Sequence, residues 1–334
     1  MDIINDYQDK KQPSKNIVYL AKPIYGGWVT FTAHLSKKYN YPIYKITKNT
    51  EKNKRIFGYD CEYQNSKISD ILKLDNIIIS AVDKHYWEYL KFFPEDTEIV
   101  IHDPTECKIS KNGNPLIQKV DDQDPILSQL RVLTIRESVQ EYLLKKFNIQ
   151  SQFMRHPFYE YSKDQKEGLG YNNVSISRID FDKNTDIILK ANQLIKNKNH
   201  VYLFGAENRI YVHHKLKDLN ISEYWKGKFP KHLSPTYENK SILKDAKYMI
   251  DMSIIKQDGG GTQYTFLEAI YEDCILILHN EWITKGSLFK SGINCLGVSN
   301  EEELASILNN DIDEDLSELI IQNSKKILED HIKY

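Results

Sequence analysis

The stretch NIVYLAKPIYGGWVTFTAHLSKKY, residues 16–39, decides the fold class. Its first six residues are a β-rich apolar run, Gly26 and Gly27 follow as a turn, and residues 28–39 carry an amphipathic helical pattern. A strand, a glycine turn and a helix in this order open a βαβ unit. The two glycines would also let backbone N–H groups and the positive end of the helix approach an anionic ligand. A tight turn that merely needs glycine is the plainer interpretation.

The same alternation continues along the chain in two series. Strand-like runs lie at residues 42–46, 76–80, 98–102, 131–135 and 151–155, and again at 174–177, 200–204, 248–252, 274–278 and 294–297; helical patterns separate most of them, including one at 84–93. This predicts an α/β protein with two Rossmann-like domains, each a parallel sheet flanked by helices, and a cleft between them.

The predicted domain limits follow from a polar stretch near residues 158–168. Residues 1–160 would form a Rossmann-like domain on the acceptor side of the cleft, and residues 161–315 a Rossmann-like domain that binds the nucleotide. Residues 316–334 would form a last helix with no strand after it, able to cross back to the first domain.

Length and composition fit this organisation. The 334 residues suit two domains of ordinary size, and 40% hydrophobic residues are enough for two cores. The net charge is −2, from 45 basic and 47 acidic residues, so no overall positive field favours a nucleic acid. The four cysteines form no close pair typical of a zinc or redox site. A polar N-terminus and no long apolar window predict a cytoplasmic protein without a membrane span.

An apolar strand runs into His102 and Asp103. The carboxyl ends of the strands in an open α/β sheet face the ligand-binding crevice. A histidine and a carboxylate there can orient a substrate hydroxyl, so both are candidate catalytic residues. The competing interpretation, given equal weight, is that His102 ends the strand and Asp103 begins a turn before Pro104.

The run SRIDFDK, residues 177–183, places Arg178 and Lys183 between a strand and a helix. Two cations at a strand end suit a diphosphate, because each makes charge-assisted hydrogen bonds to phosphoryl oxygens. A surface ion-pair cluster with Asp180 and Asp182 is the alternative.

The run DGGGT, residues 258–262, precedes a helix that contains Glu268. It predicts a second cradle for an anion at a positive helix end. The cradle would be made by Gly259, Gly260, Gly261 and Thr262. Three consecutive glycines are entropically costly, which favours a functional origin. The alternative is a mobile surface loop with Glu268 solvated.

In this order and spacing, the four stretches resemble the retaining GT-B glycosyltransferases of the GT4-like group over residues 17–308. The run SRIDFDK is similar to the donor-diphosphate motif of that group, and Arg178 and Lys183 match its cationic pair. Residues 259–269 are similar to its E-x7-E region. Glu268 matches the second Glu, which contacts the nucleotide ribose in the family, but Gly260 stands where the first Glu is expected. The resemblance also implies that Gly26 and Gly27 lie near the donor phosphate.

Within that group, residues 100–103 (VIHD) and 26–31 (GGWVTF) are similar to bacteriophage α-glycosyltransferases that modify hydroxymethylated DNA bases. This narrower resemblance implies double-stranded DNA with such bases as a partner, and a host cytoplasm as the location. It also implies an acceptor-side position for Trp28 and Thr30.

The function implied is transfer of a hexosyl or pentosyl group from a nucleoside diphosphate sugar, foremost a UDP-sugar, to an acceptor hydroxyl with retention of configuration. No metal and no other cofactor is expected, because Arg178 and Lys183 can neutralise the phosphates. The Asp-x-Asp pattern at Asp122 and Asp124 is too short to indicate a metal site. A glycan-directed glycosyltransferase, a sugar-phosphate epimerase on the same fold, and an inactive nucleotide- or DNA-binding module remain alternatives. Gly260, at the position of the first Glu, is the feature that keeps the last one open.

Overall fold

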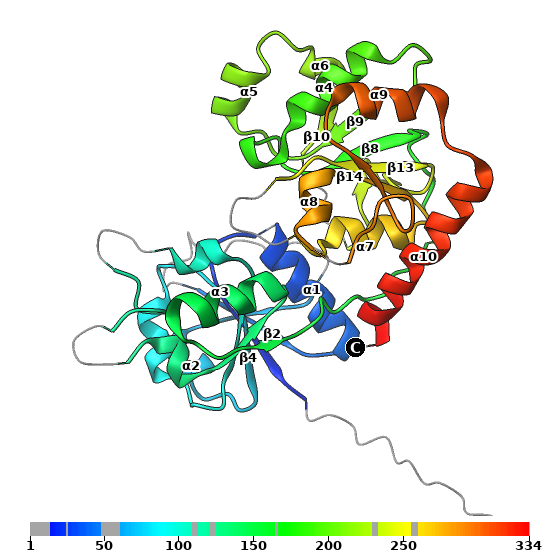
Figure 1. Cartoon of the computed structure of the whole chain (residues 1–334). Coiled ribbons are helices and arrows are strands. Elements are labelled where there is room, and N and C mark those ends of the chain that lie inside the picture. Colours follow the sequence, from blue (N-terminus) through cyan, green and yellow to red (C-terminus); the bar gives the residue numbers. More distant parts are fainter. Residues whose placement is uncertain are drawn as a thin grey trace, which may run out of the picture.

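The computed structural model describes residues 14–24, 26–47, 61–108, 113–119, 124–163, 166–228, 233–254, 260–286 and 288–333. These residues form two α/β domains, drawn from blue to green and from green to red in Figure 1. Each domain is built on a parallel sheet with helices packed against it, as the alternating pattern of the sequence predicts.

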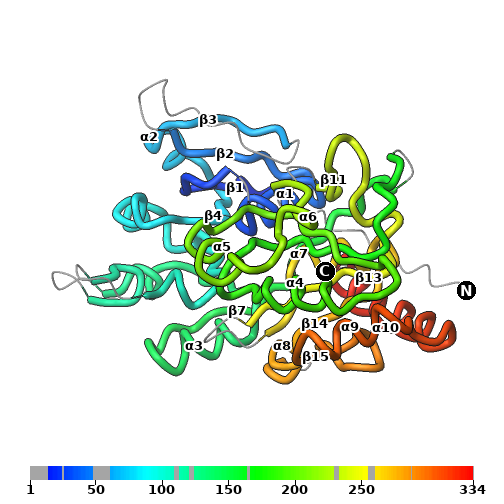
Figure 2. The backbone as a smooth tube through the Cα atoms, turned by 90° about the horizontal axis from the view of Figure 1, so that it is seen from above, coloured from blue at the N-terminus to red at the C-terminus, as the bar shows by residue number. Residues whose placement is uncertain are grey.

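The first domain contains a seven-stranded sheet in the order β3-β2-β1-β4-β5-β6-β7. Its strands are β1 (Asn16–Leu20), β2 (Ile43–Ile46), β3 (Gln64–Ser66), β4 (Ile77–Val82), β5 (Glu98–Ile101), β6 (Arg131–Thr134) and β7 (Gln152–Phe153). Its helices are α1 (Gly27–Tyr39), α2 (Ile68–Ile71) and α3 (Glu137–Phe147), with 3-10 turns at Trp87–Phe92, Pro104–Cys107 and Ile126–Gln129. All neighbouring strands are parallel. Figure 2 shows β3, β2, β1 and β4 side by side in this order.

The second domain contains a six-stranded sheet in the order β10-β9-β8-β13-β14-β15. Its strands are β8 (Asn173–Ile176), β9 (Val201–Phe204), β10 (Trp225–Gly227), β13 (Tyr248–Asp251), β14 (Ile275–His279) and β15 (Leu296–Val298). A small hairpin, β11 (Thr236–Tyr237) and β12 (Lys240–Ser241), stands apart from it. The helices are α4 (Thr185–Leu194), α5 (Arg209–Lys215), α6 (Ile221–Tyr224), α7 (Tyr264–Tyr271), α8 (Asn280–Thr284), α9 (Glu301–Asn310) and α10 (Glu314–Lys333), with a 3-10 turn at Phe181–Lys183.

Apart from the additional edge strand β7 of the first sheet, both sheets have the same strand order, and this places the ligand crevice. In each, the strand order reverses at the first strand: β1 lies between β2 and β4, and β8 lies between β9 and β13. The central strands β1 and β4 are buried almost throughout, because helices cover both faces of a parallel sheet. The crevice beyond the carboxyl ends of such strands, at the point of reversal, is where open α/β sheets bind ligands.

One predicted helix has a different form. Residues 84–93 carry a helical pattern, but the structure has a 3-10 turn at Trp87–Phe92. Pro94 follows at once, and the residue before a proline is disfavoured in the α conformation. Phe93 is accordingly extended, and the segment ends there.

The two domains share an apolar interface. One buried cluster joins Phe31 of α1, Phe158 of the connecting segment, Phe266 of α7 and Leu328 of α10. The last helix runs from the second domain down to α1 (Figure 1). There the Lys38 ammonium donates to the carbonyl oxygen of His331 (2.8 Å). The long helix thus connects the domains a second time.

Candidate active site

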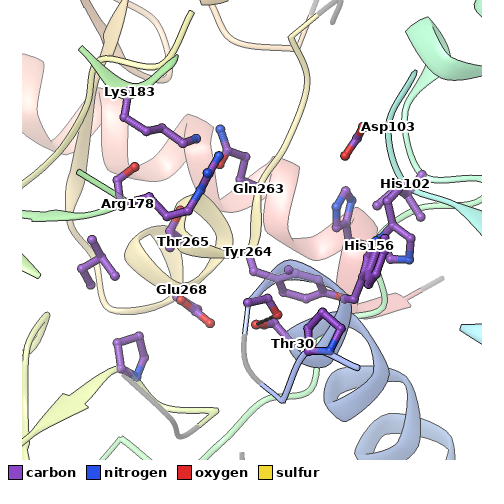
Figure 3. Close-up of a pocket in the computed structure, with 18 of the residues that line it drawn as sticks. Thr30, His102, Asp103, His156, Arg178, Lys183, Gln263, Tyr264, Thr265 and Glu268 are labelled. Carbon is purple, nitrogen blue, oxygen red and sulfur yellow. Dashed lines mark hydrogen bonds between the residues drawn. The ribbon is translucent and has the colours of Figure 1, made fainter. Parts of the chain in front are cut away.

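A cavity of about 430 Å³ lies between the carboxyl ends of the two sheets. This volume is within the range of small-molecule sites. The first domain lines it with Pro23, Gly26, Gly27, Trp28, Thr30, His102, Asp103, Ile135, Arg136 and His156. The second domain contributes Ile176, Ser177, Arg178, Lys183, Ala206, Pro235, Gln263, Tyr264, Thr265 and Glu268. In Figure 3, Arg178 and Lys183 lie on one side of the cavity, and His102, Asp103 and His156 lie opposite them.

The glycine turn at Gly26 and Gly27 lines the cavity on the side of the first domain. Gly26 precedes α1 with φ 102°, a conformation that favours glycine, and its carbonyl accepts from the N–H groups of Val29 and Thr30. No side chain caps the helix start. A Cβ atom at either Gly26 or Gly27 would meet no atom within 4 Å, so the backbone at this helix end faces open space. The N–H groups of Gly27 and Trp28, at the start of the helix, have no capping side chain and can donate to whatever occupies the cavity.

His102 is a neutral histidine in a fixed orientation. It is buried, and its Nε2 lies 2.8 Å from the carbonyl oxygen of Ser80, which can only accept, so Nε2 carries the proton. Burial lowers the pKa of the ring to about 4, so His102 is uncharged at neutral pH. Its Nδ1 is then an acceptor for a ligand hydroxyl. An edge-to-face contact between the His102 and Phe31 rings helps to fix this orientation.

Asp103 has the structural role that the plainer interpretation predicts, and it also lines the cavity. One carboxylate oxygen caps the 3-10 turn by accepting from the N–H and the hydroxyl of Thr105. The side chain borders the cavity beside His102. One oxygen of Asp103 is therefore used to cap the turn, and only the other carboxylate oxygen, Oδ2, is a candidate to bind a ligand.

Glu106 is a residue that the sequence pattern did not single out. Its Oε1 accepts from the indole N–H of Trp28 (3.1 Å) and from the backbone N–H of His102 (3.1 Å). Burial raises the pKa of the Glu106 carboxyl well above its usual value. The carboxyl therefore holds the glycine-turn helix and the end of β5 together, and orients Trp28 at the cavity.

Both cations of the predicted diphosphate motif border the cavity, in different settings. Arg178 has a half-exposed side chain and donates to Asp180 (2.8 Å) and Asp182 (3.0 Å), so the ion-pair cluster considered as the alternative is present. Lys183 is buried and donates to the hydroxyl of Ser253 (2.8 Å). Burial lowers the pKa of Lys183, and the nearby Asp251 opposes that shift.

The glycine run before α7 has a backbone that only glycine fits. Gly259 lies outside the described residues. Gly260 has φ 79°, and a Cβ atom there would lie 2.6 Å from the carbonyl oxygen of Trp282. The family glutamate expected at Gly260 would therefore collide with α8. Gly261 also has a positive φ, and its carbonyl accepts from the Trp282 indole N–H (3.0 Å).

Thr262 and Glu268 are both buried, so Glu268 is not the solvated residue of the alternative interpretation. The Thr262 hydroxyl is buried without a hydrogen-bond partner among the described residues. Glu268 is 4% exposed and lines the cavity from α7, and burial raises its pKa to about 8. A carboxyl in this setting is protonated at neutral pH until a donor or a cation stabilises its charge.

Arg136 and His156 complete the first-domain wall and were missed in the sequence. Arg136 follows β6, and its guanidinium lies over the Trp282 ring of the second domain (5.7 Å). His156 follows β7; it is buried, and its ring packs edge-on against Tyr264 (5.1 Å). Both lie just beyond strand ends, so the rule that drew attention to His102 would also have found them.

The described residues contain neither a metal-binding cluster nor a helix able to span a membrane. No group of three or more His, Cys, Asp or Glu side chains in them is arranged to hold a metal ion. Asp122 of the Asp-x-Asp pattern lies outside them, and Asp124 pairs with Lys119. Within the same residues, every helix is too short or too polar to cross a membrane.

No family model matches the chain, and no curated protein matches its sequence. Solved structures do match. HepE of Anabaena in complex with UDP is 14% identical, with a TM-score of 0.63 over 95% of both chains; with UDP-glucose the identity is 12% and the TM-score 0.63. A glycosyltransferase of Rickettsia africae is 12% identical, with a TM-score of 0.58 over 96% of this chain and 94% of that one. At these identities the likeness shows the fold, and the predicted α/β class with two Rossmann-like domains, the GT-B architecture of these glycosyltransferases, is confirmed.

Proposed function

We propose that this protein is a glycosyltransferase that moves a sugar from a UDP-sugar to an acceptor hydroxyl with retention of configuration. The observation that carries the proposal is the cavity between the carboxyl ends of two Rossmann-like sheets, with Arg178 and Lys183 opposite the open helix end at Gly26. Structures of the same fold are bound to UDP and UDP-glucose. A nucleoside diphosphate carries the negative charge that these groups are suited to bind.

The chemistry would rest on stabilising the leaving diphosphate. As the bond from the sugar to the diphosphate breaks, negative charge grows on the phosphoryl oxygens, and preorganised cations and helix N–H groups lower the energy of that state. Arg178, Lys183 and the loop before α7 would supply this stabilisation. The departing phosphate would take the proton of the acceptor hydroxyl on the same face of the sugar, which gives retention without a separate protein base.

The first-domain wall would orient the hydroxyls. The neutral His102 ring would accept from a sugar hydroxyl through Nδ1, and the non-capping oxygen of Asp103 would accept from a second. Trp28 and Thr30 would lie on the acceptor side. Closure of the domains would exclude water and suppress hydrolysis of the donor.

The proposal requires no metal ion, because Arg178, Lys183 and the helix N–H groups would neutralise the diphosphate. We therefore expect EDTA to leave the rate of transfer largely unchanged, measured against protein with added Mg²⁺ or Mn²⁺. Complete loss of activity that either ion restores would contradict this and favour the Asp-x-Asp segment as a metal site.

The decisive experiment supplies UDP-sugars with and without an acceptor panel. Transfer to a saccharide or DNA hydroxyl, with an α-anomeric product from an α-linked donor by NMR, would support the proposal. Conversion of the sugar without an acceptor would identify an epimerase instead. Binding without transfer, hydrolysis or conversion would identify an inactive nucleotide-binding module.

For the acceptor, we propose a hydroxymethylated base in double-stranded DNA. The support is the resemblance of residues 26–31 and 100–103 to phage enzymes, together with Trp28 at the cavity and Lys22 and Lys37 on the same domain. Phosphate contacts would make the affinity for DNA fall with salt, by roughly 0.9 in the log–log slope for each neutralised phosphate. The base would have to leave the stack to reach the cavity, and Trp28 would fill the gap. Transfer to glycans but to no hydroxymethylated DNA would reject this acceptor and leave the transferase proposal standing.

A further inference from the structure

His34 lies between the domains and has no role in the reaction proposed above. It is fully buried on α1, and its ring stacks between Phe158 of the connecting segment and Tyr264 of α7, at centroid distances of 5.0 and 4.5 Å. A ring packed on both faces has little freedom to rotate, so the directions of its two nitrogen atoms are fixed.

The proton of this ring is on Nε2. The backbone N–H of Tyr159 donates to Nδ1 (3.0 Å), so Nδ1 carries no hydrogen. Burial lowers the pKa of His34 to about 3, so the ring is neutral and its single proton lies on Nε2. This buried N–H has no hydrogen-bond partner among the described residues. Unpaired buried donors are rare in native proteins because they lose their bond to water, so this one needs an explanation.

The Nε2 atom faces Glu268 across the domain boundary. It lies 3.9 Å from Oε1 of Glu268, too far for a hydrogen bond. With pKa values near 3 and 8, both groups are uncharged at neutral pH, so the contact is not an ion pair. Glu268 and Asp103 are the two carboxyl side chains among the described residues that line the cavity. The other titratable groups near the pair are Tyr161, Tyr264, His156 and Lys38.

We propose that His34 is a positioning residue for Glu268: its Nε2–H donates to the Glu268 carboxylate when a nucleotide sugar occupies the cavity, and holds that carboxylate toward the ligand's hydroxyls. The inference rests on the proposed function, because it takes a hydroxyl-bearing ligand as the occupant. Hydroxyl donors bind an ionised carboxylate more strongly than a neutral one. Binding therefore favours ionisation of Glu268, and the new charge attracts the N–H of the opposite domain across the gap.

A pH dependence of binding follows. Glu268 must lose its proton to bind, so affinity rises as the pH approaches 8 and levels off above it. Without the His34 N–H the ionised form is less favourable, and the midpoint moves to higher pH.

The test measures UDP-glucose binding to the full chain by calorimetry from pH 6 to 8.5, where the diphosphate of this ligand does not titrate. Two substitutions test the roles of the two His34 nitrogen atoms one at a time. His34→Asn keeps an acceptor near the Nδ1 position for Tyr159 but loses the donor to Glu268. His34→Gln keeps a donor near the Nε2 position. We expect His34→Asn to weaken binding about tenfold at pH 7.5, the size of one hydrogen bond to a charged group, and to raise the midpoint. His34→Gln should stay within about threefold of the parent at an unchanged midpoint, and Glu268→Gln should bind weakly at every pH.

The outcomes are distinguishable. If the parent does not bind UDP-glucose or UDP, the proposed function itself fails. If the parent binds and folded His34→Asn has the same affinity and midpoint, the inference is overturned. Should His34→Asn not fold, NMR of the His34 Nε2–H in the parent decides: a downfield shift on ligand binding supports the bond, and an unmoved resonance rejects it.

Discussion

Arg178 holds two carboxylates and borders the cavity with the same guanidinium. Because its side chain is half exposed, the ion pairs with Asp180 and Asp182 contribute little to stability. Their effect is to fix the direction of the guanidinium. A phosphate entering the cavity would therefore meet a preorganised donor rather than a mobile one.

We expect Arg178→Ala to reduce kcat/KM by the equivalent of about 2–4 kcal/mol, since it removes a charge-assisted phosphate contact that strengthens as the leaving group departs. Steady-state kinetics with a UDP-sugar measures this. Arg209→Ala, an exposed arginine of the same domain that does not line the cavity, is the matched control. A folded Arg178→Ala protein that works at the parent rate would remove Arg178 from the diphosphate site.

Glu268 links stability to function. Its pKa in the folded protein, about 8, lies above the ordinary 4.5, so folding favours the protonated form. Its stabilising contribution is complete below pH 4.5 and decreases as the pH rises toward 8, by up to about 1.4 kcal/mol per pH unit. Without ligand, Glu268→Gln should therefore be more stable than the parent at pH 7.5, by on the order of 4 kcal/mol.

Calorimetric Tm values of the parent and Glu268→Gln at several pH values, without ligand, measure this difference. The gap should widen from pH 5 to pH 8. A constant gap would mean that Glu268 is already ionised in the folded protein. The expected gain in stability with a loss of ligand binding is the usual cost of a binding residue.

At the scale of elements, the loop before α7 depends on its fit to α8. Gly260 has a positive φ and packs against the carbonyl oxygen of Trp282, while Gly292 has a similar φ of 76° with no atom near a Cβ position. Substituting each glycine by alanine therefore distinguishes the cost of a positive φ, present at both positions, from the cost of a steric clash, present only at Gly260. A glutamate in place of Gly260 would meet the same clash in this backbone.

Gly292→Ala should lower the free energy of unfolding by about 1 kcal/mol through the positive φ alone, and Gly260→Ala by a further 1–3 kcal/mol as its Cβ displaces α8. Denaturant unfolding measures both. Gly260→Ala should also lose activity, because Thr262 belongs to the displaced loop, which leads into α7. Equal effects of the two substitutions would show that the loop moves away from Trp282 at little cost.

At the scale of the whole molecule, two domains meet at an apolar interface, and the cavity lies beside it. The N–H of His34, which is unpaired within the part of the chain that the structure describes, and the 3.9 Å gap to Glu268 both lie at this junction. Polar groups that face each other across a domain boundary, but are too far apart for a hydrogen bond, would come closer when the domains close.

We therefore expect saturating UDP-glucose to decrease the radius of gyration, measured by small-angle X-ray scattering. Hydrogen exchange should slow in α1 and α7 at the same time. Arg178→Ala at the same ligand concentration provides the control, since it should bind less and close less. Scattering that stays unchanged while calorimetry shows saturation would mean that the cavity is already in its closed form.

The architecture can be predicted from local sequence patterns. Alternating strand and helix periods predict two parallel sheets, because side-chain burial in each element depends on local spacing. The sequence also identified the ends of β1, β5 and β8, where Gly26, His102 and Arg178 border one cavity. This was possible because the carboxyl ends of parallel strands lie on one edge of their sheet, whatever the rest of the chain does.

Which of these residues meet across the domains, and in what protonation state, depends on how the folded domains pack. The pairing of His34 with Glu268, and the contact of Arg136 with Trp282, join residues far apart in the chain. No local pattern records them. The buried state of Glu268, and hence its raised pKa, depends on α1 and α7 packing together, and the need for glycine at Gly260 depends on the position of α8. Burial and distance are properties of packed neighbours, and neighbours from separate domains are set only when the domains assemble.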